Sequence, residues 1–145
     1  MSTWMVVEDE PDIYEVLLAM FEMWGIDGVA FVDGEEASAW IEEVGEGRFK
    51  GELPELALLD IRLPGLTSGP EVGAKLRKCP PLSQSAIVLF TAYRLTPEEE
   101  KVFIAQADAD KLMYKPLPRL NELKVILEEV IAARRAKASV QNPKP

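Results

Sequence analysis

The sequence predicts an α/β fold, a doubly wound parallel sheet of five strands in which each strand is followed by a helix. Three observations predict it: short apolar runs recur along the chain, stretches of helical periodicity lie between them, and glycine, proline and aspartate mark the turns. The predicted strands begin near residues 3, 27, 56, 86 and 111. Parallel strands joined by helices require right-handed crossovers, so we expect helices on both faces of the sheet.

The first two helices are predicted from their apolar faces. From Ile13 to Trp24, large apolar residues recur three and four positions apart, and Gly25 ends this helix. Asp33 and Gly34 mark a turn before the second helix. Its inner face is predicted to carry Ala37, Trp40, Ile41 and Val44.

The other three helices are predicted from the residues at their ends. Pro70 begins the third helix, which ends before Cys79. Pro97, followed directly by three glutamates, begins the fourth. The fifth runs from about Leu120 to Lys137, and its apolar side chains are spaced to face the sheet.

Length and composition predict one domain, residues 1–137, followed by a polar tail at 138–145 that we expect to be disordered. The 145 residues, 48% of them apolar, are too few for a second sizeable domain, so any output is expected from the surface of this one. No apolar stretch is long enough to span a membrane, and the N-terminus lacks the pattern of a signal peptide. Cys79 is the only cysteine, which fits a reducing cytoplasm.

The absence of histidine and the acidic charge exclude other functional classes. Without an imidazole the chain cannot carry a phosphohistidine, and a zinc site is disfavoured. The net charge of −9 disfavours nucleic-acid binding, because neutralisation of phosphates supplies much of that affinity. The one basic stretch, residues 133–137, is too short to form a DNA-binding domain.

Charged and hydroxyl residues stand at the downstream ends of four predicted strands. They are Glu8 and Asp9, Asp60, Thr91, and Lys115 with Pro116 after it. Since the carboxyl ends of parallel strands line one edge of the sheet, we expect these side chains to converge on one site. The site would combine three carboxylates, a hydroxyl and an ammonium.

This set of groups favours phosphoryl transfer to a carboxylate. Carboxylate oxygens without nitrogen or sulfur ligands suit Mg²⁺. Asp60, which ends a buried strand, is the expected nucleophile, because an aspartate can form an acyl phosphate. Lys115 would contribute positive charge, and Thr91 a short hydrogen-bond donor, to the phosphoryl oxygens.

Each of these residues also has a simpler interpretation. Residues 8–11 would make an acidic helix start, Thr91 a turn at a strand end, and Lys115 part of a loop. Asp60 is harder to explain in this way, because a charge that ends an apolar strand is costly unless it lies at a wet, functional edge. All four features would have to coincide by chance, which favours the functional interpretation.

The pattern resembles the receiver domain of two-component response regulators over about Thr3 to Arg134. The matching stretches are VVEDEPDI at 6–13, LLDIRLPG at 58–65, FTA at 90–92 and YKPL at 114–117. The resemblance implies the flavodoxin-like strand order 2-1-3-4-5, which places the first and third strands side by side.

The resemblance also implies a role for each site residue. The metal ligands would be Glu8, Asp9, Asp60 and the backbone carbonyl of Arg62. Thr91 and Lys115 would bind the oxygens of a phosphoryl group that Asp60 accepts from a histidine kinase or a histidine phosphotransfer protein. The peptide bond before Pro116 is expected to be cis. Phosphorylation would switch a surface of the fourth helix, fifth strand and fifth helix toward a downstream protein or a second copy of the chain.

The sequence departs from the family pattern at two places. A glycine expected after the proline that follows the acceptor comes one residue late, within residues 65–69. Leu112 stands three residues before Lys115, where the family has a tyrosine or phenylalanine that rotates inward on activation. We place Tyr114 on the opposite face of the strand from Leu112, and expect a muted switch or one carried by Tyr93.

The leading functional class is a stand-alone phosphoacceptor switch, which is not a turnover enzyme. The alternatives are an interaction module that works without phosphorylation and the receiver part of a larger phosphorelay. A flavin carrier would need a glycine-rich loop where residues 8–10 are acidic. A phosphatase of the haloacid dehalogenase type would need a second aspartate where Arg62 stands.

Arg62 and Tyr93 also bear on how long a phosphoryl group would survive. By the resemblance, both flank the path of a water molecule toward the phosphorus, and neither is suited to orient that water. The sequence therefore predicts slow self-dephosphorylation.

Overall fold

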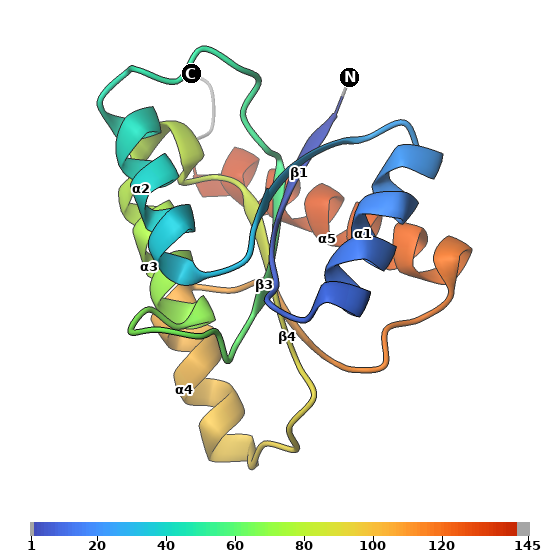
Figure 1. Ribbon diagram of the computed structural model, residues 1–145. Coiled ribbons are helices and arrows are strands. Elements are labelled where there is room, and N and C mark those ends of the chain that lie inside the picture. The colour runs from blue at the N-terminus through green and yellow to red at the C-terminus, as the bar shows by residue number, and fades with distance from the viewer. Residues whose placement is uncertain (1, 142–145) are drawn as a thin grey trace.

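The computed structural model describes residues 2–141, in which five strands and five α-helices alternate along the chain (Figure 1). The strands are β1 (Thr3–Val7), β2 (Asp27–Phe31), β3 (Leu56–Asp60), β4 (Ala86–Thr91) and β5 (Lys111–Tyr114). The helices are α1 (Pro11–Met23), α2 (Gly34–Gly45), α3 (Gly69–Lys78), α4 (Pro97–Ala107) and α5 (Leu120–Gln141), with a short 3₁₀ helix at Pro80–Leu82. All strand pairs are parallel in the order β2-β1-β3-β4-β5, which confirms the predicted fold class.

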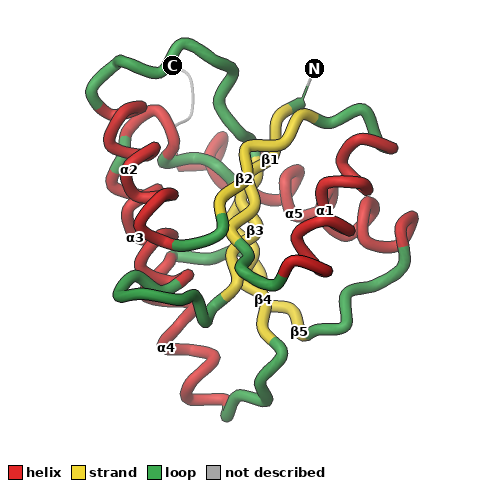
Figure 2. Tube along the Cα trace, in the orientation of Figure 1, coloured by secondary structure: helices red, strands yellow, loops and turns green. Residues whose placement is uncertain are grey.

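A layer of helices covers each face of the sheet (Figure 2). Helices α1 and α5 lie on one face, and α2, α3 and α4 lie on the other. Along β1 the side chains alternate between the two cores, so that Trp4 and Val6 pack toward α1 and α5, whereas Met5 and Val7 pack toward α2 and α3. Because both faces are covered, β1, β3 and β4 are buried at every position, and their residues are apolar except at one end of each strand.

Four of the five parallel strands carry site residues where they end, and their register positions the site. Asp60 is the last residue of β3, Thr91 is the last residue of β4, and Glu8 directly follows β1. Thr91 is paired with Tyr114, the last residue of β5, so Lys115 leaves the sheet beside it. Residues far apart in the sequence thus meet at the carboxyl ends of the strands.

Helices α2, α3 and α4 begin at side-chain caps. The Ser68 hydroxyl accepts a hydrogen bond from the Glu71 backbone N–H while the Glu71 carboxylate accepts from the Ser68 N–H, and Thr96 and Glu99 do the same for α4. Asp33 caps α2 without such a reciprocal bond. The carboxyl edge of the sheet is therefore bordered by well-defined helix starts.

Two predicted boundaries differ from the structure. Helix α3 begins at Gly69, just before Pro70, and α5 continues through Gln141 instead of ending at Lys137. Residues 138–141, predicted to be disordered, are helical because they follow the helix without a proline or glycine to stop it. Residues 142–145, the rest of the predicted tail, lie outside the described residues.

Helix α5, at 22 residues, carries many charged side chains. Within residues 2–141, no helix is both long and apolar enough to cross a membrane.

Candidate functional site

The three predicted carboxylates meet at the carboxyl edge of the sheet. Glu8 and Asp60 are buried, whereas Asp9 is exposed. One oxygen from each of Glu8, Asp9 and Asp60 lies within 4.8 Å of the other two. Carboxylates this close repel one another unless a cation or a proton intervenes, so the site requires positive charge.

Lys115 supplies part of that charge. Its Nζ atom lies 2.7 Å from Glu8 Oε1 and 3.1 Å from Asp60 Oδ2, and only 7% of its side chain is exposed. It also lies 3.4 Å from Oε1 of Glu10, a residue that the sequence did not indicate as part of the site. An acid in the first residues of a helix has an ordinary explanation, and no sequence signal separates Glu10 from that class.

Burial shapes the protonation of this cluster. Burial and the neighbouring Asp60 carboxylate raise the pKa of Glu8 from the usual 4.5 to about 7. Burial also raises the pKa of Asp9, and the Glu8 carboxylate adds to that shift. Burial alone would lower the pKa of Lys115, but Glu8 and Asp60 outweigh it and hold that pKa above its usual range. Lys115 therefore stays charged, and Glu8 is the carboxyl group that takes a proton near neutral pH.

Backbone hydrogen bonds fix the acceptor and the hydroxyl. The Arg62 N–H donates to Asp60 Oδ1 at 3.3 Å, and the Tyr93 N–H donates to Thr91 Oγ1 at 3.2 Å. The Lys115 N–H donates to the Thr91 carbonyl at 2.8 Å. Thr91 is buried, so its hydroxyl lies inside the edge of the sheet.

A magnesium ion fits this set of donors. All three carboxylate ligands offer oxygen, as Mg²⁺ prefers. Glu8 Oε1 is buried and pairs with the Lys115 ammonium at 2.7 Å, so this oxygen already lies where positive charge is stabilised. Glu8, Asp9 and Asp60 are therefore the residues that would hold the metal, and the Arg62 carbonyl remains a predicted ligand.

Arg62 and Tyr93 contact each other beside the acceptor. The guanidinium carbon of Arg62 lies 4.0 Å from the centre of the Tyr93 ring, a cation–π arrangement. Each of the two follows a site residue by two positions, Asp60 and Thr91 respectively. The sequence placed both near the site, but their mutual contact appears only in the structure.

The late glycine of the loop after β3 lies where a side chain cannot fit. A Cβ atom on Gly69 would lie 2.0 Å from the backbone oxygen of Asp60. The Gly69 N–H donates to the Ile61 carbonyl at 3.1 Å, which holds the start of α3 against the end of β3. The loop is thus closed onto the acceptor by Gly69, and its departure from the family pattern leaves Asp60 in place.

The predicted orientation of Tyr114 is wrong. Leu112 packs in the core on the α2, α3 and α4 side, and the Tyr114 hydroxyl donates to the Glu100 carboxylate on α4, on the same side. Strand side chains alternate with a period of two, so residues 112 and 114 must share a face. Hydrogen bonding to Glu100 raises the pKa of Tyr114. Leu112 stands at the position expected for the rotating aromatic residue.

A groove of about 520 Å³ opens beside Lys115, between α1 and the segment that follows β5. Its apolar wall includes Ile13, Val16, Met20, Pro116 and Leu117. The Lys115–Pro116 peptide bond is cis. The half-exposed Val16 belongs to this wall, so the rim of the site presents apolar surface to solvent.

Comparison with known proteins identifies the family. Residues 4–128 match the response regulator receiver domain. Over 111 residues the chain is 32% identical to the phosphate regulon transcriptional regulatory protein PhoB of Rhizobium meliloti, covering 77% of this chain and 44% of that protein. The chain spans 43 to 52% of the length of the curated relatives it matches.

Two crystal structures are similar over almost their whole length. One is a CheY-like response regulator receiver domain protein from Methanospirillum hungatei, with a TM-score of 0.76 and 25% identity over 94% of this chain and 98% of that one. The other is the receiver domain of the sensor histidine kinase PA1611 of Pseudomonas aeruginosa, with a TM-score of 0.72 and 25% identity over 90% of this chain and 98% of that one. The second structure has a magnesium ion coordinated in its active site cleft. With its strand order, its acidic cluster and this match, the chain belongs to the response regulator receiver domain family.

Proposed function

We propose that this protein is a phosphoacceptor switch, in which Asp60 receives a phosphoryl group from a partner histidine kinase or histidine phosphotransfer protein. The observation that carries the proposal is the Lys115 ammonium, which bridges Glu8 and Asp60 inside a pocket of oxygen ligands. The donor must supply the histidine, because the chain has none. The aspartyl group is an acceptor used once per cycle, so the protein is not a turnover enzyme on a small molecule.

The residues present divide the chemistry among them. A carboxylate oxygen of Asp60 attacks the phosphorus, and the new O–P bond forms as the P–N bond to the donor imidazole breaks, with the electron pair remaining on that imidazole. Lys115 and the Thr91 hydroxyl bind the phosphoryl oxygens. When bound at Glu8, Asp9 and Asp60, Mg²⁺ neutralises charge on the same oxygens.

The groove beside Lys115 suits the kinase or phosphotransfer partner. Its apolar wall from α1 and from the residues after Pro116 adjoins Lys115, which pairs with Asp60. A partner helix that packs there would bring a histidine to the site while burying apolar surface. Asp12 and Glu10 at its rim would favour a partner with basic residues nearby.

The output surface of the proposed switch is formed by α4, β5 and α5. Val102 and Val125 are exposed on its helices, at 61% and 53%. This face would bind a downstream protein or a second copy of the chain after phosphorylation.

The test is phosphoryl incorporation measured by intact-protein mass spectrometry. With acetyl phosphate as donor, we expect one added phosphoryl group on the parent in the presence of Mg²⁺ and none when the metal is chelated. Asp60→Asn keeps the size and shape of the side chain and should remain unmodified. Incorporation that persists in Asp60→Asn would rule out the proposed acceptor.

A second candidate function is an interaction module that works without phosphorylation. It is favoured by Leu112, which stands where the family has a mobile aromatic residue. Under this alternative, affinity for a partner would be equal before and after acetyl phosphate treatment, whereas the proposed switch requires a difference.

A further inference from the structure

Tyr114 lies between the two residues proposed to hold the phosphoryl group. It is the strand partner of Thr91 and the chain neighbour of Lys115. Its hydroxyl donates a hydrogen bond to the carboxylate of Glu100 on α4. One side chain therefore joins the edge of the site directly to a helix of the output surface.

The first turns of α4 are weakly held elsewhere: from Pro97 to Val102 no residue is buried, and Phe103 is the first that packs against the core. Among the residues of α4 only Ala107, at its last position, is buried. Glu98 and Glu99 are exposed, and Val102 is 61% exposed. A segment with so little buried surface depends on a few specific contacts, and local opening there is inexpensive.

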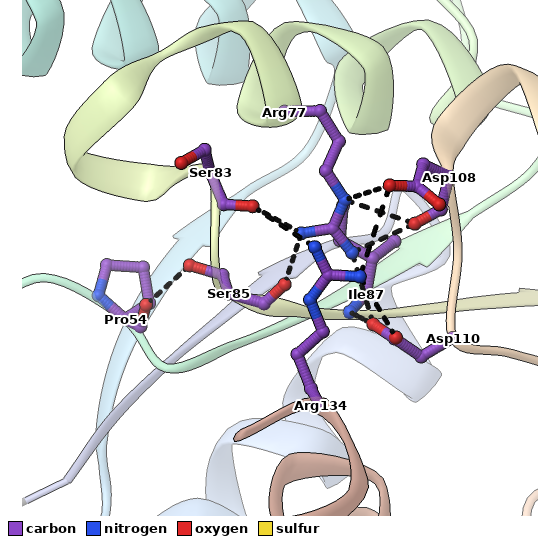
Figure 3. Close-up of polar contacts among 8 residues, drawn as sticks. All are labelled: Pro54, Arg77, Ser83, Ser85, Ile87, Asp108, Asp110 and Arg134. Atoms are coloured by element: carbon purple, nitrogen blue, oxygen red, sulfur yellow. Dashed lines mark hydrogen bonds and ion pairs between the residues drawn. The ribbon is translucent and has the colours of Figure 1, made fainter. Parts of the chain in front are cut away.

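The C-terminal end of α4 is firmly held. A Cβ on Gly73 of α3 would lie 2.6 Å from the Ala107 Cβ, so the two helices touch closely at this point. The Asp108 carbonyl, just beyond the helix, accepts two hydrogen bonds from the Arg77 guanidinium, at 2.9 and 3.1 Å (Figure 3). Asp108 itself has a left-handed backbone (φ 49°), which ends α4 at a defined residue.

The same anchor is tied to the sheet. Asp110, before β5, pairs with Arg77 at 3.1 Å and accepts a hydrogen bond from the backbone N–H of Ile87 in β4 at 2.8 Å. Arg134 of α5 reaches the other oxygen of Asp110 at 3.5 Å, so the carboxylate lies between two guanidinium groups (Figure 3). Helix α4 is thus fixed at its C-terminal end to α3, β4, β5 and α5.

We propose that the hydrogen bond from Tyr114 to Glu100 is a latch that holds the N-terminal half of α4 in the unphosphorylated protein, and that phosphorylation releases it so that α4 pivots about its fixed end at Ala107. This proposal rests on the proposed function, because phosphorylation of Asp60 is the event that releases the latch. Thr91 and Lys115 flank Tyr114, and both must turn toward the phosphoryl oxygens. In doing so, they shift the Tyr114 backbone and draw its hydroxyl away from Glu100.

Leu112 explains why a latch at this position is needed. It presents only an apolar side chain to the α4 side of the sheet and has no polar group with which to bind α4. Within residues 2–141, Tyr114 is the residue of β5 with a hydrogen bond from its side chain to α4. The residue that connects the site to α4 is therefore Tyr114, two positions after Leu112 on β5 and on the same face of the strand.

Hydrogen–deuterium exchange of the unphosphorylated protein tests the latch. Tyr114→Phe removes only the hydroxyl, and we expect exchange of the amides at 100–103 to become on the order of fivefold faster, while those of Ala107 and β4 stay unchanged. Glu100→Ala should have the same effect, and Glu100→Gln should not, because its amide oxygen still accepts the bond. Glu98→Ala, a change of equal charge in the same turn at an exposed position, is the matched control and should leave exchange within about twofold.

A second measurement compares the proteins after acetyl phosphate treatment, with phosphoryl uptake followed by mass. The parent should gain the faster exchange at 100–103, and Tyr114→Phe, already released, should gain little more. Equal exchange in unphosphorylated parent and Tyr114→Phe would overturn the latch. So would normal uptake with unchanged α4 exchange, which leaves Asp60 standing as the phosphoacceptor. Absence of uptake in the parent would overturn the trigger, and that failure would belong to the proposed function.

Discussion

Glu8 is fully buried beside the Asp60 carboxylate and the Lys115 ammonium, so its protonation depends on both neighbours and on pH. Its raised pKa means that, without metal, the folded protein holds a proton that the unfolded chain has already lost between about pH 4.5 and 7. In that window the folded state binds more protons, so the stability of the metal-free protein falls as the pH rises through it. A metal ion reverses this preference, because it requires the ionised carboxylate.

The first prediction is that Mg²⁺ affinity rises with pH up to about 7. Below that value the metal must displace the proton of Glu8, so affinity should fall by close to tenfold per pH unit, and level off above it. Titration followed by NMR shifts at the site measures this. The Glu8→Gln variant should bind Mg²⁺ more weakly and with a shallower pH dependence. The pH dependence that remains would come from Asp9, whose pKa is also raised. Equal affinity in the parent and a Glu8→Ala, Asp9→Ala double variant would place the metal elsewhere.

The second prediction concerns the lifetime of the phosphoryl group. The Arg62 guanidinium stacked on the Tyr93 ring borders the acceptor and restricts an in-line water, so self-dephosphorylation should be slow. Arg62→Asn combined with Tyr93→Glu should accelerate phosphate loss by roughly tenfold or more, since both replacements can orient a water. Tyr93→Phe keeps the ring and serves as the control, with a rate near that of the parent. If the parent lost phosphate as fast as the double variant, these two side chains would not shield the site.

At the scale of elements, helix contacts decide how rigidly the output surface is anchored. Gly73 allows α3 and α4 to approach until the Ala107 side chain touches the α3 backbone. Three of the five helices start at prolines or capping boxes that are legible in the sequence, whereas this close contact depends on two residues in different helices. The strength of the anchor is therefore a tertiary property.

The third prediction follows from that contact. Gly73→Ala should destabilise the protein by roughly 1–3 kcal/mol, because the added methyl overlaps Ala107 and outweighs the gain in helix propensity. Gly45→Ala is the matched control, since its Cβ would meet only the Cys79 sulfur at 3.6 Å, and it should be neutral or slightly stabilising. Urea denaturation of both variants measures the difference. A Gly73→Ala variant as stable as the parent would mean that the helices separate at no cost.

The sequence predicted the elements best where local signals were strong. Buried strands that end in Asp60 or Thr91 and helices that begin at proline could be recognised because each pattern lies within a few residues. The end of α5 was missed, since no stop signal lies near Lys137. Tyr114 was placed on the wrong face although the two-residue period of a strand settles it.

At the scale of the whole molecule, the two ends of the sheet have different roles. The carboxyl end gathers Glu8, Asp60 and Lys115 into a pocket that requires a cation, and the network of Arg77 and Asp110 ties strands to helices near the amino ends of β4 and β5. The first group could be predicted from strand ends. The second could not, because its members belong to α3, α5 and a loop, with no shared sequence pattern.

In the proposed switch, a phosphorylation signal would travel along the output surface from a mobile end to a fixed end. The proposed switch predicts that chemistry at Asp60 changes α4 and β5 most near the site and least near Ala107, where the helix is anchored. Helix α2 lies on the same face of the sheet as α4 but outside the output surface, so its amide signals should remain unaffected.

The most direct measurement of the central claim is an NMR amide spectrum of the protein with Mg²⁺, recorded before and after acetyl phosphate is added. The claim predicts shifts at the loops around Asp60 and along α4, β5 and the facing part of α5, none of which should occur in Asp60→Asn. Shifts confined to the immediate surroundings of Asp60, or identical shifts in Asp60→Asn, would contradict the claim that phosphorylation of this aspartate switches the output surface.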